Sequence, residues 1–370
     1  MPMMNKMVVA NLVHRPIRSL ISIIAIALEV TLILLIVGLS YGFLNDSKHR
    51  NAGLGFDVIV QPPGSSFLTG ISGAPVSEKV ADVLRAMPHV KVVSPVIWQL
   101  ATGGGIELID GIDIPSFEAL GGPIQYVQGG PFQGPNDALV DDFIAAQKHV
   151  KVGDSMDILN QKFRISGIVE NGRGARKFLP MATLQDLIGA KGKASVFYVK
   201  LDDPLNIDSV IAEVNKQPGM EKYSVLSMQQ YLSMMAPSHL PGFRIFIGVV
   251  IGVSVVIGFL VIFQSMYTAV MERTREIGIL KSMGASKLYI VNVILRETVL
   301  LTLAGIIVGI TFSLLARIAI EHRWPLVHID KSVDWMIRAT IVALAGAAAG
   351  AIYPAYKAAQ KDPIDALAYE

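Results

Sequence analysis

Four long runs of apolar residues limit what this chain can fold into more than any other feature. A helix needs about 20 apolar residues to cross the hydrocarbon core of a bilayer. Residues 20–39 contain a single charge, Glu29, and residues 245–270, 298–316 and 339–356 contain none. Over the whole chain 52% of residues are hydrophobic and 17% are charged, against about 25% charged in an average soluble domain. The sequence therefore predicts an integral membrane protein with four transmembrane helices.

Lysine and arginine near the ends of these runs predict the orientation, because cytoplasmic loops of membrane proteins carry the excess of positive charge. Basic residues without acidic ones precede the first run, and five Lys and Arg stand against three Glu between the second and third runs. Residues 46–241 instead carry 17 Lys and Arg against 20 Asp and Glu, a net charge of −3. We therefore expect both termini in the cytoplasm and residues 46–241 on the other side of the membrane.

The large segment after the first run changes character, because Gly, Pro, Asp and short apolar runs replace the long apolar ones. Strands are expected at 56–61, 90–96, 105–112, 155–159, 163–170 and 195–201, and helices at 77–87, with Ser77 as N-cap, and at 207–217. We therefore predict an α+β extracytoplasmic domain inserted between two spans. The expected segments are a cytoplasmic amphipathic lead-in (1–19), transmembrane helix 1 (20–45), the extracytoplasmic domain (46–241), transmembrane helix 2 (242–270), a cytoplasmic coupling region (271–297), transmembrane helix 3 (298–317), an extracytoplasmic loop (318–334), transmembrane helix 4 (335–356) and a cytoplasmic tail (357–370).

The sequence lacks the motifs that would let the chain catalyse a reaction alone. Gly192 and Lys193 come nearest to a phosphate-binding P-loop, but Ala194 follows them and Leu187 stands where the first glycine belongs. There is no H-E-x-x-H, G-x-S-x-G or EF-hand pattern, the seven His show no metal-ligand spacing, and Cys is absent. We expect no catalytic residue, no metal and no cofactor bound by this chain. A net charge of only +2 also argues against nucleic acid as a partner.

Glu29 is the polar residue that stands out inside the predicted spans. An ionised carboxylate near the middle of a bilayer costs a few kcal/mol, so it should face a partner, a cavity or a proton. One interpretation makes Glu29 a contact for a transported molecule in the interior of the helix bundle. The other makes it a neutral or hydrogen-bonded carboxyl that serves packing between helices.

Three cytoplasmic stretches carry a resemblance to a known family. Residues 271–286 read MERTREIGILKSMGAS and resemble the R-x-x-E-I-G-x-L-[KR]-A-x-G-A stretch of MacB/FtsX-type ABC transporter permeases, departing at Ser282. Residues 353–367 are similar to the family ending P-A-x-x-A-A-x-x-D-P-x-x-A-L, and residues 11–20 to the lead-in of its first span. In the large segment, short pieces at 138–140, 152–154, 163–168, 178–180 and 200–204 also follow the pattern of the family's periplasmic core domain. The resemblance covers the whole chain and leaves the cargo subfamily open, DevC-like and haem-exporter-like permeases included.

By this resemblance, residues 271–286 would dock on a separate ATPase subunit. Ile277, Leu280 and Met283 recur at helical spacing and would form a small apolar face on a helix that continues from the second span over 245–281. The alternative is an ordinary positive-inside loop stabilised by local ion pairs. The expected ATPase-coupling residues are Glu272, Arg273, Arg275, Glu276, Ile277, Gly278, Leu280, Lys281, Gly284 and Ala285, and those of the C-terminal motif are Pro354, Ala355, Asp362 and Pro363.

The resemblance implies the permease subunit of an ABC transporter in a bacterial cytoplasmic (inner) membrane. It would work as a homodimer with ATP and Mg²⁺ held by the partner ATPase subunit, and it would transmit ATP-driven motion to its extracytoplasmic domain. One hypothesis is export of an amphipathic or lipophilic molecule, with a membrane-fusion or other extracytoplasmic adaptor protein as a further partner beside membrane lipid. The alternative is a signalling module that controls an extracytoplasmic protein without transport. A membrane-embedded enzyme is a third, remote reading.

Overall fold

The computed structural model describes residues 16–65, 73–101, 107–235, 242–324 and 327–362. The chain separates into two compact units, which are described here one at a time. We call the part within residues 1–42, 242–323 and 329–370 the helical unit. We call the part within residues 43–241 and 324–328 the sheet unit.

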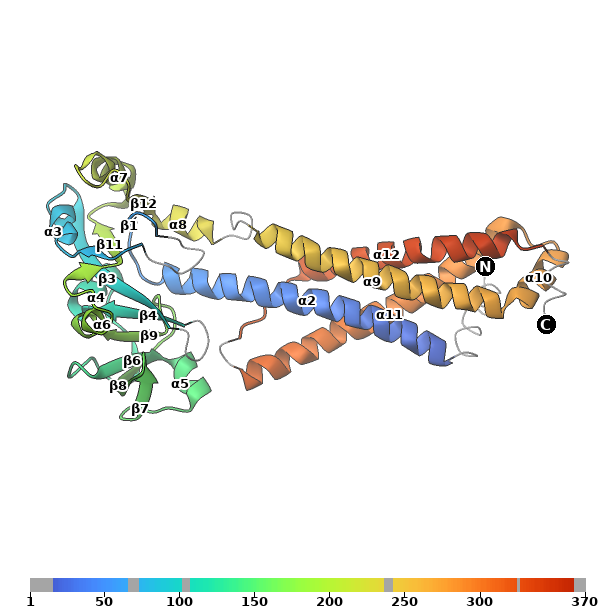
Figure 1. Ribbon diagram of the computed structural model, residues 1–370, viewed down its shortest axis with the longest axis horizontal. Coiled ribbons are helices and arrows are strands. Elements are labelled where there is room, and N and C mark those ends of the chain that lie inside the picture. The colour runs from blue at the N-terminus through green and yellow to red at the C-terminus, as the bar shows by residue number, and fades with distance from the viewer. Residues whose placement is uncertain (1–15, 66–72, 102–106, 236–241, 325–326, 363–370) are drawn as a thin grey trace. The chain divides into compact units, whose positions relative to one another are not determined.

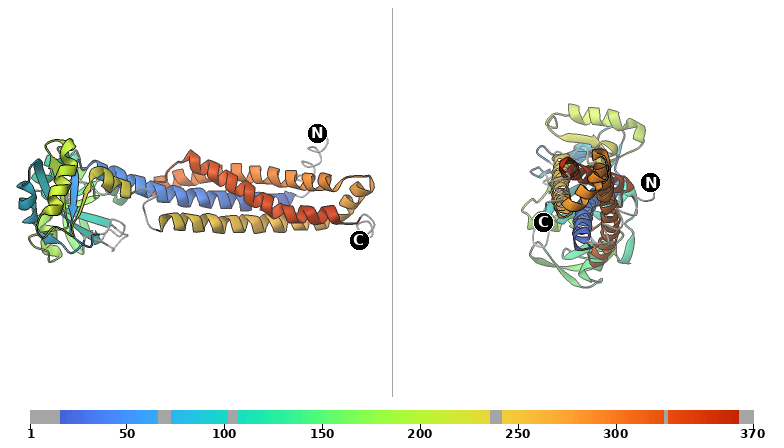
Figure 2. Two further views of the ribbon diagram at one scale, coloured as in Figure 1. Left: turned by 90° about the horizontal axis from the view of Figure 1, so that it is seen from above. Right: turned by 90° about the vertical axis from the view of Figure 1, so that its right-hand side faces the viewer.

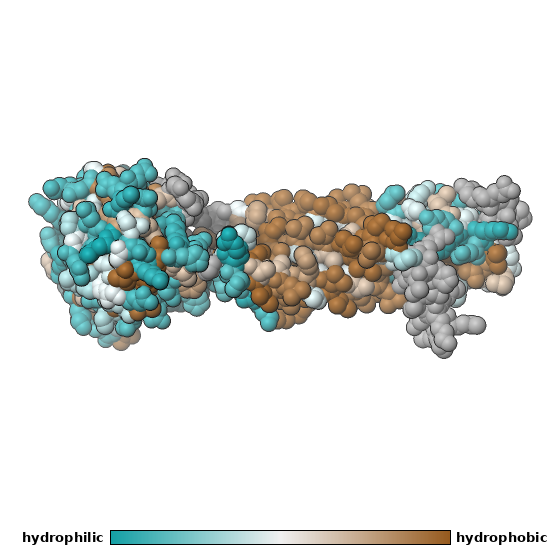
Figure 3. Space-filling model, turned by 90° about the horizontal axis from the view of Figure 1, so that it is seen from below, coloured by the Kyte–Doolittle hydropathy of each residue, from teal (hydrophilic) through white to brown (hydrophobic). Residues whose placement is uncertain are grey.

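The helical unit is a bundle of long helices (Figures 1 and 2). Its helices are α2 (Pro16–Ala52), α9 (Phe243–Glu272), α10 (Thr274–Ser282), α11 (Lys287–Arg323) and α12 (Val333–Gln360), and the end of α2 belongs to the sheet unit. α2, α9, α11 and α12 are long and apolar enough to cross a membrane. Figure 3 shows hydrophobic residues gathered over these helices. Among the described residues, the structure thus has the four candidate transmembrane helices that the sequence predicts.

Small residues let the long helices approach closely. A β-carbon at Gly309 on α11 would lie 2.7 Å from the backbone oxygen of Ala27 on α2, and one at Gly350 on α12 would lie 2.7 Å from the backbone oxygen of Phe259 on α9. The Thr31 hydroxyl also donates a hydrogen bond to the backbone oxygen of Gly309. Helices in a bilayer associate through such close packing, because lipid tails are as apolar as the side chains.

The helix expected over 245–281 is divided in two, because α9 ends at Glu272 and α10 begins at Thr274. Between them Arg273 has φ −108° and ψ 17°, outside the helical region. The Thr274 hydroxyl donates to the backbone oxygens of Val270 and Met271, and these bonds hold the turn. A single continuous helix was therefore the wrong prediction, and the basic segment forms a short helix of its own.

The sheet unit is built around a mixed ten-stranded sheet in the described residues. Its order is β12-β1-β11-β3-β4-β9-β6-β8-β5, with β7 paired to β8, and β4–β9 and β6–β8 are the parallel pairs. The strands are β1 (Val58–Gln61), β3 (Val90–Ala101), β4 (Glu107–Ile112), β5 (Tyr126–Gly129), β6 (Asp137–Asp141), β7 (Ser155–Ile158), β8 (Gln161–Val169), β9 (Lys177–Pro180), β11 (Val196–Leu201) and β12 (Ser224–Ser227). A separate two-stranded sheet pairs β2 (Val76–Ser77) with β10 (Lys193–Ala194).

Short helices cover this sheet, and they confirm the α+β prediction. They are α3 (Val80–Arg85), α4 (Ile114–Gly121), α5 (Asp142–Lys148), α6 (Met181–Leu187), α7 (Ile207–Lys216) and α8 (Met228–Met234), with a 3-10 turn, η1, at Pro204–Asn206. The six predicted strands are all present. The N-cap prediction was wrong, because Ser77 lies in β2 and Lys79 occupies the N-cap of α3.

Candidate functional site

A buried carboxylate joins three parts of the helical unit. Glu297 on α11 accepts hydrogen bonds from Arg18 on α2 at 2.8 Å and from Arg273, between α9 and α10, at 2.9 and 3.2 Å. Glu297 is 2% exposed, and both arginine side chains are largely buried. We call these three residues the Glu297 cluster.

The Glu297 cluster fixes where α10 begins. Charge-assisted hydrogen bonds are roughly twice as strong as neutral ones, and removing one member of a buried ion pair is costly. The Arg273 guanidinium turns toward Glu297 on α11, at 2.9 and 3.2 Å. The cluster therefore ties the start of α2, the break between α9 and α10, and α11 to one another.

α10 presents a charged face and buries an apolar one. Glu276 and Arg275 are exposed, whereas Ile277 and Gly278 pack into the bundle core. Of the three residues expected to form an apolar face, Ile277 is buried, Leu280 is half-buried and Met283 is exposed. Of the predicted coupling residues in the described chain, those that lie exposed are Glu272, Arg275, Glu276 and Gly284. Those that are half-buried are Arg273, Leu280, Lys281 and Ala285.

Lys281 connects α10 to the end of α12. Its ammonium donates to the backbone oxygens of Ala359, at 3.0 Å, and of Lys361. The last carbonyls of a helix have no partner inside the helix, and a lysine here satisfies them. Two of the three segments that carry the family resemblance, residues 271–286 and 353–367, are thus bonded to each other.

The C-terminal motif is split between the bundle core and the surface. Pro354 and Ala355 are buried inside the bundle, where they pack rather than face a partner protein. Asp362 is exposed. Pro363 lies outside the described residues, so its predicted role stays a prediction.

A cavity of about 280 Å³ lies beside α10. Its walls include Met266, Ile277 and Ile294, and Glu276 and Glu297 add charged groups. Exposed Glu276 therefore borders an apolar hollow formed by α9, α10 and α11. Within the described residues, no group of three or more His, Asp or Glu side chains is arranged to hold a metal ion.

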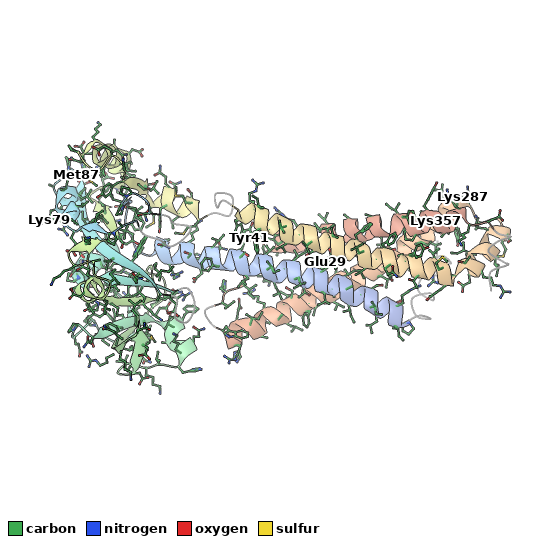
Figure 4. The ribbon with its side chains drawn as sticks, in the orientation of Figure 1. Glu29, Tyr41, Lys79, Met87, Lys287 and Lys357 are labelled. Carbon is green, nitrogen blue, oxygen red and sulfur yellow. The ribbon has the colours of Figure 1, made fainter. Side chains whose placement is uncertain are left out.

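Glu29 lies inside the bundle and not on its lipid-facing surface. It is 5% exposed, midway along the part of α2 that runs beside α9 (Figure 4). A β-carbon at Gly258 on α9 would lie only 2.0 Å from Oε2 of Glu29, so glycine makes room for the carboxylate. Oε1 is buried and has no hydrogen-bond partner among the described residues.

In the sheet unit, a salt-bridge chain holds the end of α2. Arg176 donates to Asp46 on α2 at 2.9 Å and to Asp141, the N-cap of α5, at 2.8 Å. Burial raises the pKa of Asp141, and the nearby Arg176 lowers it in part. The Arg50 guanidinium donates a hydrogen bond to the backbone oxygen of Gly174, and the backbone N–H of Gly174 donates one to the backbone oxygen of Arg50. The last turns of α2 are thereby bonded to the loop before β9.

Asp110 on β4 is a second buried carboxyl of the sheet unit. It is 1% exposed, and its Oδ1 has no hydrogen-bond partner among the described residues. Burial raises the pKa of Asp110 to about 7, although a backbone hydrogen bond from Ala175 and the charge of Arg50 lower it in part. This carboxyl therefore titrates near neutral pH.

Two family models match the chain over nearly its whole length. The MacB-like periplasmic core domain matches residues 19–217, and the FtsX-like permease C-terminal domain matches residues 248–363. This chain belongs to the ABC transporter permeases of the MacB/FtsX type. The resemblance predicted from the 271–286 and 353–367 stretches is confirmed. Membership of this family makes the chain a multi-pass membrane protein and implies an ATPase partner.

Curated relatives of this permease agree with that assignment. An ABC transporter permease of Methanocaldococcus jannaschii is 26% identical over 387 residues, which cover 96% of this chain and 95% of the relative. The macrolide export ATP-binding/permease protein MacB of a Shewanella species is 23% identical over 382 residues. The permease spans 59% of the length of that MacB protein. The permease YvrN of Bacillus subtilis is 23% identical over 404 residues, which cover 95% of this chain and 96% of the relative.

Sequence reasoning about this permease missed the Glu297 cluster and the Lys281 contacts. Arg18 and Glu297 lie 279 positions apart, so no local pattern links them. A signal was nevertheless present, because Glu297 directly precedes an apolar run and Arg18 lies two residues before another. Opposite charges at the same expected membrane depth are candidates for pairing.

Proposed function

We propose that this permease transmits ATP-driven motion from a separate ATPase subunit to its extracytoplasmic domain, and that it exports an amphipathic or lipophilic molecule. The observation that carries the proposal is the position of α10. This helix exposes Arg275 and Glu276, and it is bonded to α11 and α2 through the Glu297 cluster and to α12 through Lys281. A push on α10 would therefore reach every long helix of the bundle.

Two further observations support the route of transmission. α2 is one continuous helix from Pro16 to Ala52, and its last turns are bonded to Arg176 and Gly174 in the sheet unit. A rigid helix carries displacement along its axis with little loss. The Shewanella relative is named as an ATP-binding/permease protein, so the two functions act together in that protein. By the same pairing of functions, the proposal places ATP and Mg²⁺ on an ATPase subunit that acts with this permease.

The proposal places the permease as a homodimer in a bacterial cytoplasmic membrane, with both termini in the cytoplasm. The excess of Lys and Arg before α2 and around α10 supports this orientation. A membrane-fusion or other adaptor protein on the extracytoplasmic side would complete an exporter, and membrane lipid would surround the bundle. The second candidate function is a signalling module that acts on an extracytoplasmic protein without transport.

Reversing one exposed charge on α10 tests the coupling assignment. We expect Glu276→Arg to lower ATP turnover by the assembled complex while the permease stays folded, because the changed charge would lie at the ATPase contact. Glu213→Arg, on the exposed face of α7 in the sheet unit, is the matched control and should leave turnover unchanged. Normal assembly and turnover in the Glu276 variant would refute docking at α10.

The role of Glu29 separates export from signalling. If Glu29 contacts cargo, Glu29→Gln should abolish stimulation of ATP turnover by cargo while basal turnover persists. If a bound extracytoplasmic protein controls turnover and Glu29→Gln has no effect, the signalling alternative holds. Gly258→Ala adds a packing control, because its methyl group would displace the carboxylate, whereas Gly252→Ala on the same helix meets no atom within 4 Å.

A further inference from the structure

A buried carboxyl in the sheet unit supports the loop to which the end of α2 is bonded. Asp110 on β4 is 1% exposed, and the backbone N–H of Ala175, in the loop before β9, donates a hydrogen bond to it. The preceding residue of that loop, Gly174, exchanges two hydrogen bonds with Arg50 of α2. Asp110 and Arg50 therefore hold neighbouring residues of one loop from opposite sides.

Gly174 brings these groups into close contact. Its φ of 77° is in the left-handed region that favours glycine. A β-carbon at Gly174 would lie 3.3 Å from Oδ2 of Asp110, so the carboxyl packs directly against the loop backbone. A change in the charge of Asp110 therefore acts on the same residue that Arg50 holds.

Two complementary groups beside this contact lack partners. Trp98 on β3 is the register partner of Asp110 on β4, so the two side chains are neighbours on one face of the sheet. Phe178, the register partner of Asp110 on β9, is apolar. Nε1 of Trp98 and Oδ1 of Asp110 are both buried without a hydrogen-bond partner among the described residues. The Trp98 N–H is thus a donor that an ionised Asp110 could use.

The groups that face Asp110 favour its neutral form. Arg50 is a cation that acts on it, but Arg50 is also paired with Asp46 on α2, at 3.1 Å. Tyr198 on β11 and Tyr231 on α8 have raised pKa values, mainly through burial, and the charge of Asp110 adds to the effect. Burial raises the pKa of Asp110 itself to about 7, since the surroundings only partly compensate its charge. The arrangement seen here therefore suits the protonated carboxyl.

We propose that this group is a proton-sensitive latch for the end of α2: a protonated Asp110 keeps Gly174 and Arg50 in the arrangement seen here, and an ionised Asp110 loosens it. Ionisation places a negative charge against Gly174 and draws the Arg50 guanidinium toward the carboxylate. The bonds between α2 and the loop then weaken. The latch concerns the sheet unit alone. Its effect on motion carried along α2 rests on the proposed function, by which the permease would respond to pH outside the cytoplasm.

Hydrogen exchange of the full-length chain in lipid nanodiscs tests the latch. An opening that exposes Asp110 to water returns its pKa from about 7 to its ordinary value near 4, so the opening equilibrium should rise about tenfold between pH 6 and pH 8. After correction for intrinsic exchange, the Gly174 N–H should exchange about tenfold faster at pH 8. The Ile165 N–H on β8, which donates to the backbone oxygen of Asp154, should not follow.

Two variants assign the effect to one carboxyl. Asp110→Asn should remove the pH dependence of exchange at Gly174. Asp208→Asn, at an exposed position on α7, should leave it unchanged. A flat profile at Gly174 in the native chain, or equal changes at Gly174 and Ile165, would overturn the proposal, because the first shows no latch and the second shows an opening of the whole sheet unit.

Trp98 gives a second readout that does not require the Asp110 variant to fold. With Trp324→Phe and Trp335→Phe, Trp98 is the remaining tryptophan, and its fluorescence should titrate with a midpoint near pH 7. Arg50→Leu should move this midpoint to higher pH, because the charge of Arg50 lowers the pKa of Asp110. Fluorescence that stays constant between pH 5 and pH 9 would contradict the latch.

Discussion

Replacing Glu297 by Gln removes the negative charge that two buried arginines share. The carboxylate accepts three hydrogen bonds from Arg18 and Arg273, at 2.8 to 3.2 Å, and is almost fully shielded from solvent. Removing one partner of a buried ion pair typically costs about 3–5 kcal/mol, because the other charge stays buried. We therefore expect Glu297→Gln to lower the free energy of unfolding by about 3 kcal/mol.

A neighbouring acid provides the control for this experiment. Oε2 of Glu272 lies 3.9 Å from Nη1 of Arg18, and the side chain of Glu272 is 41% exposed. Exposed ion pairs contribute about 0–1 kcal/mol, so Glu272→Gln should change stability by less than about 1 kcal/mol. Both variants would be unfolded by SDS in mixed micelles, with helix content followed by circular dichroism.

Coupling between the partners sharpens the test. Arg18→Met should cost much less in the Glu297→Gln background than in the native chain, because the interaction is already lost there. A loss below about 1 kcal/mol for Glu297→Gln, or additive effects of the two changes, would refute the reasoning that this buried cluster holds the bundle together.

Three further predictions concern the sheet unit. Burial raises the pKa of Asp110 to about 7, so the folded state favours the protonated carboxyl. The free energy of unfolding should therefore fall as pH rises from about 4 to about 7 and level off above that pH. Asp110→Asn should flatten this pH profile, as measured by denaturant titrations followed by tryptophan fluorescence. Arg176→Met leaves the buried Asp141 carboxylate without its arginine, so it should lower the free energy of unfolding by about 3 kcal/mol and speed hydrogen exchange at the end of α2. Arg85→Met removes an exposed pair with Asp82 and should lower it by less than about 0.5 kcal/mol. A β-carbon at Gly53 would lie 1.8 Å from the backbone oxygen of the facing loop, so Gly53→Ala should cost about 1–3 kcal/mol, whereas Gly130→Ala, with no atom within 4 Å, should be nearly neutral by the same measurement.

The membrane helices were predictable because each is a long apolar run that can be recognised from consecutive residues alone. Their packing was not, since the charges of Arg18 and Glu297 meet only after the chain folds back on itself. The same limit explains the helix expected over 245–281. Its period is helical throughout, and at the break Arg273 bonds to Glu297, which lies on a different helix and which no local pattern indicates.

In the sheet unit, the predicted strands had strong apolar or alternating patterns. The missed strands β2 and β10 are two residues long, and β5, β6, β9 and β12 are four or five residues long and are defined by their neighbours. β6, for example, pairs with β8 and β9, which lie further along the sequence.

Purification of the tagged chain from its native membrane in mild detergent tests the central claim most directly. Mass spectrometry of the purified material would identify the proteins that accompany it. The account predicts a P-loop ATPase in stoichiometric amount, bound through α10, and predicts that Glu276→Arg reduces its recovery. If no ATPase accompanies the chain, even under conditions that trap ATP, the claim that ATP-driven motion enters through α10 is contradicted.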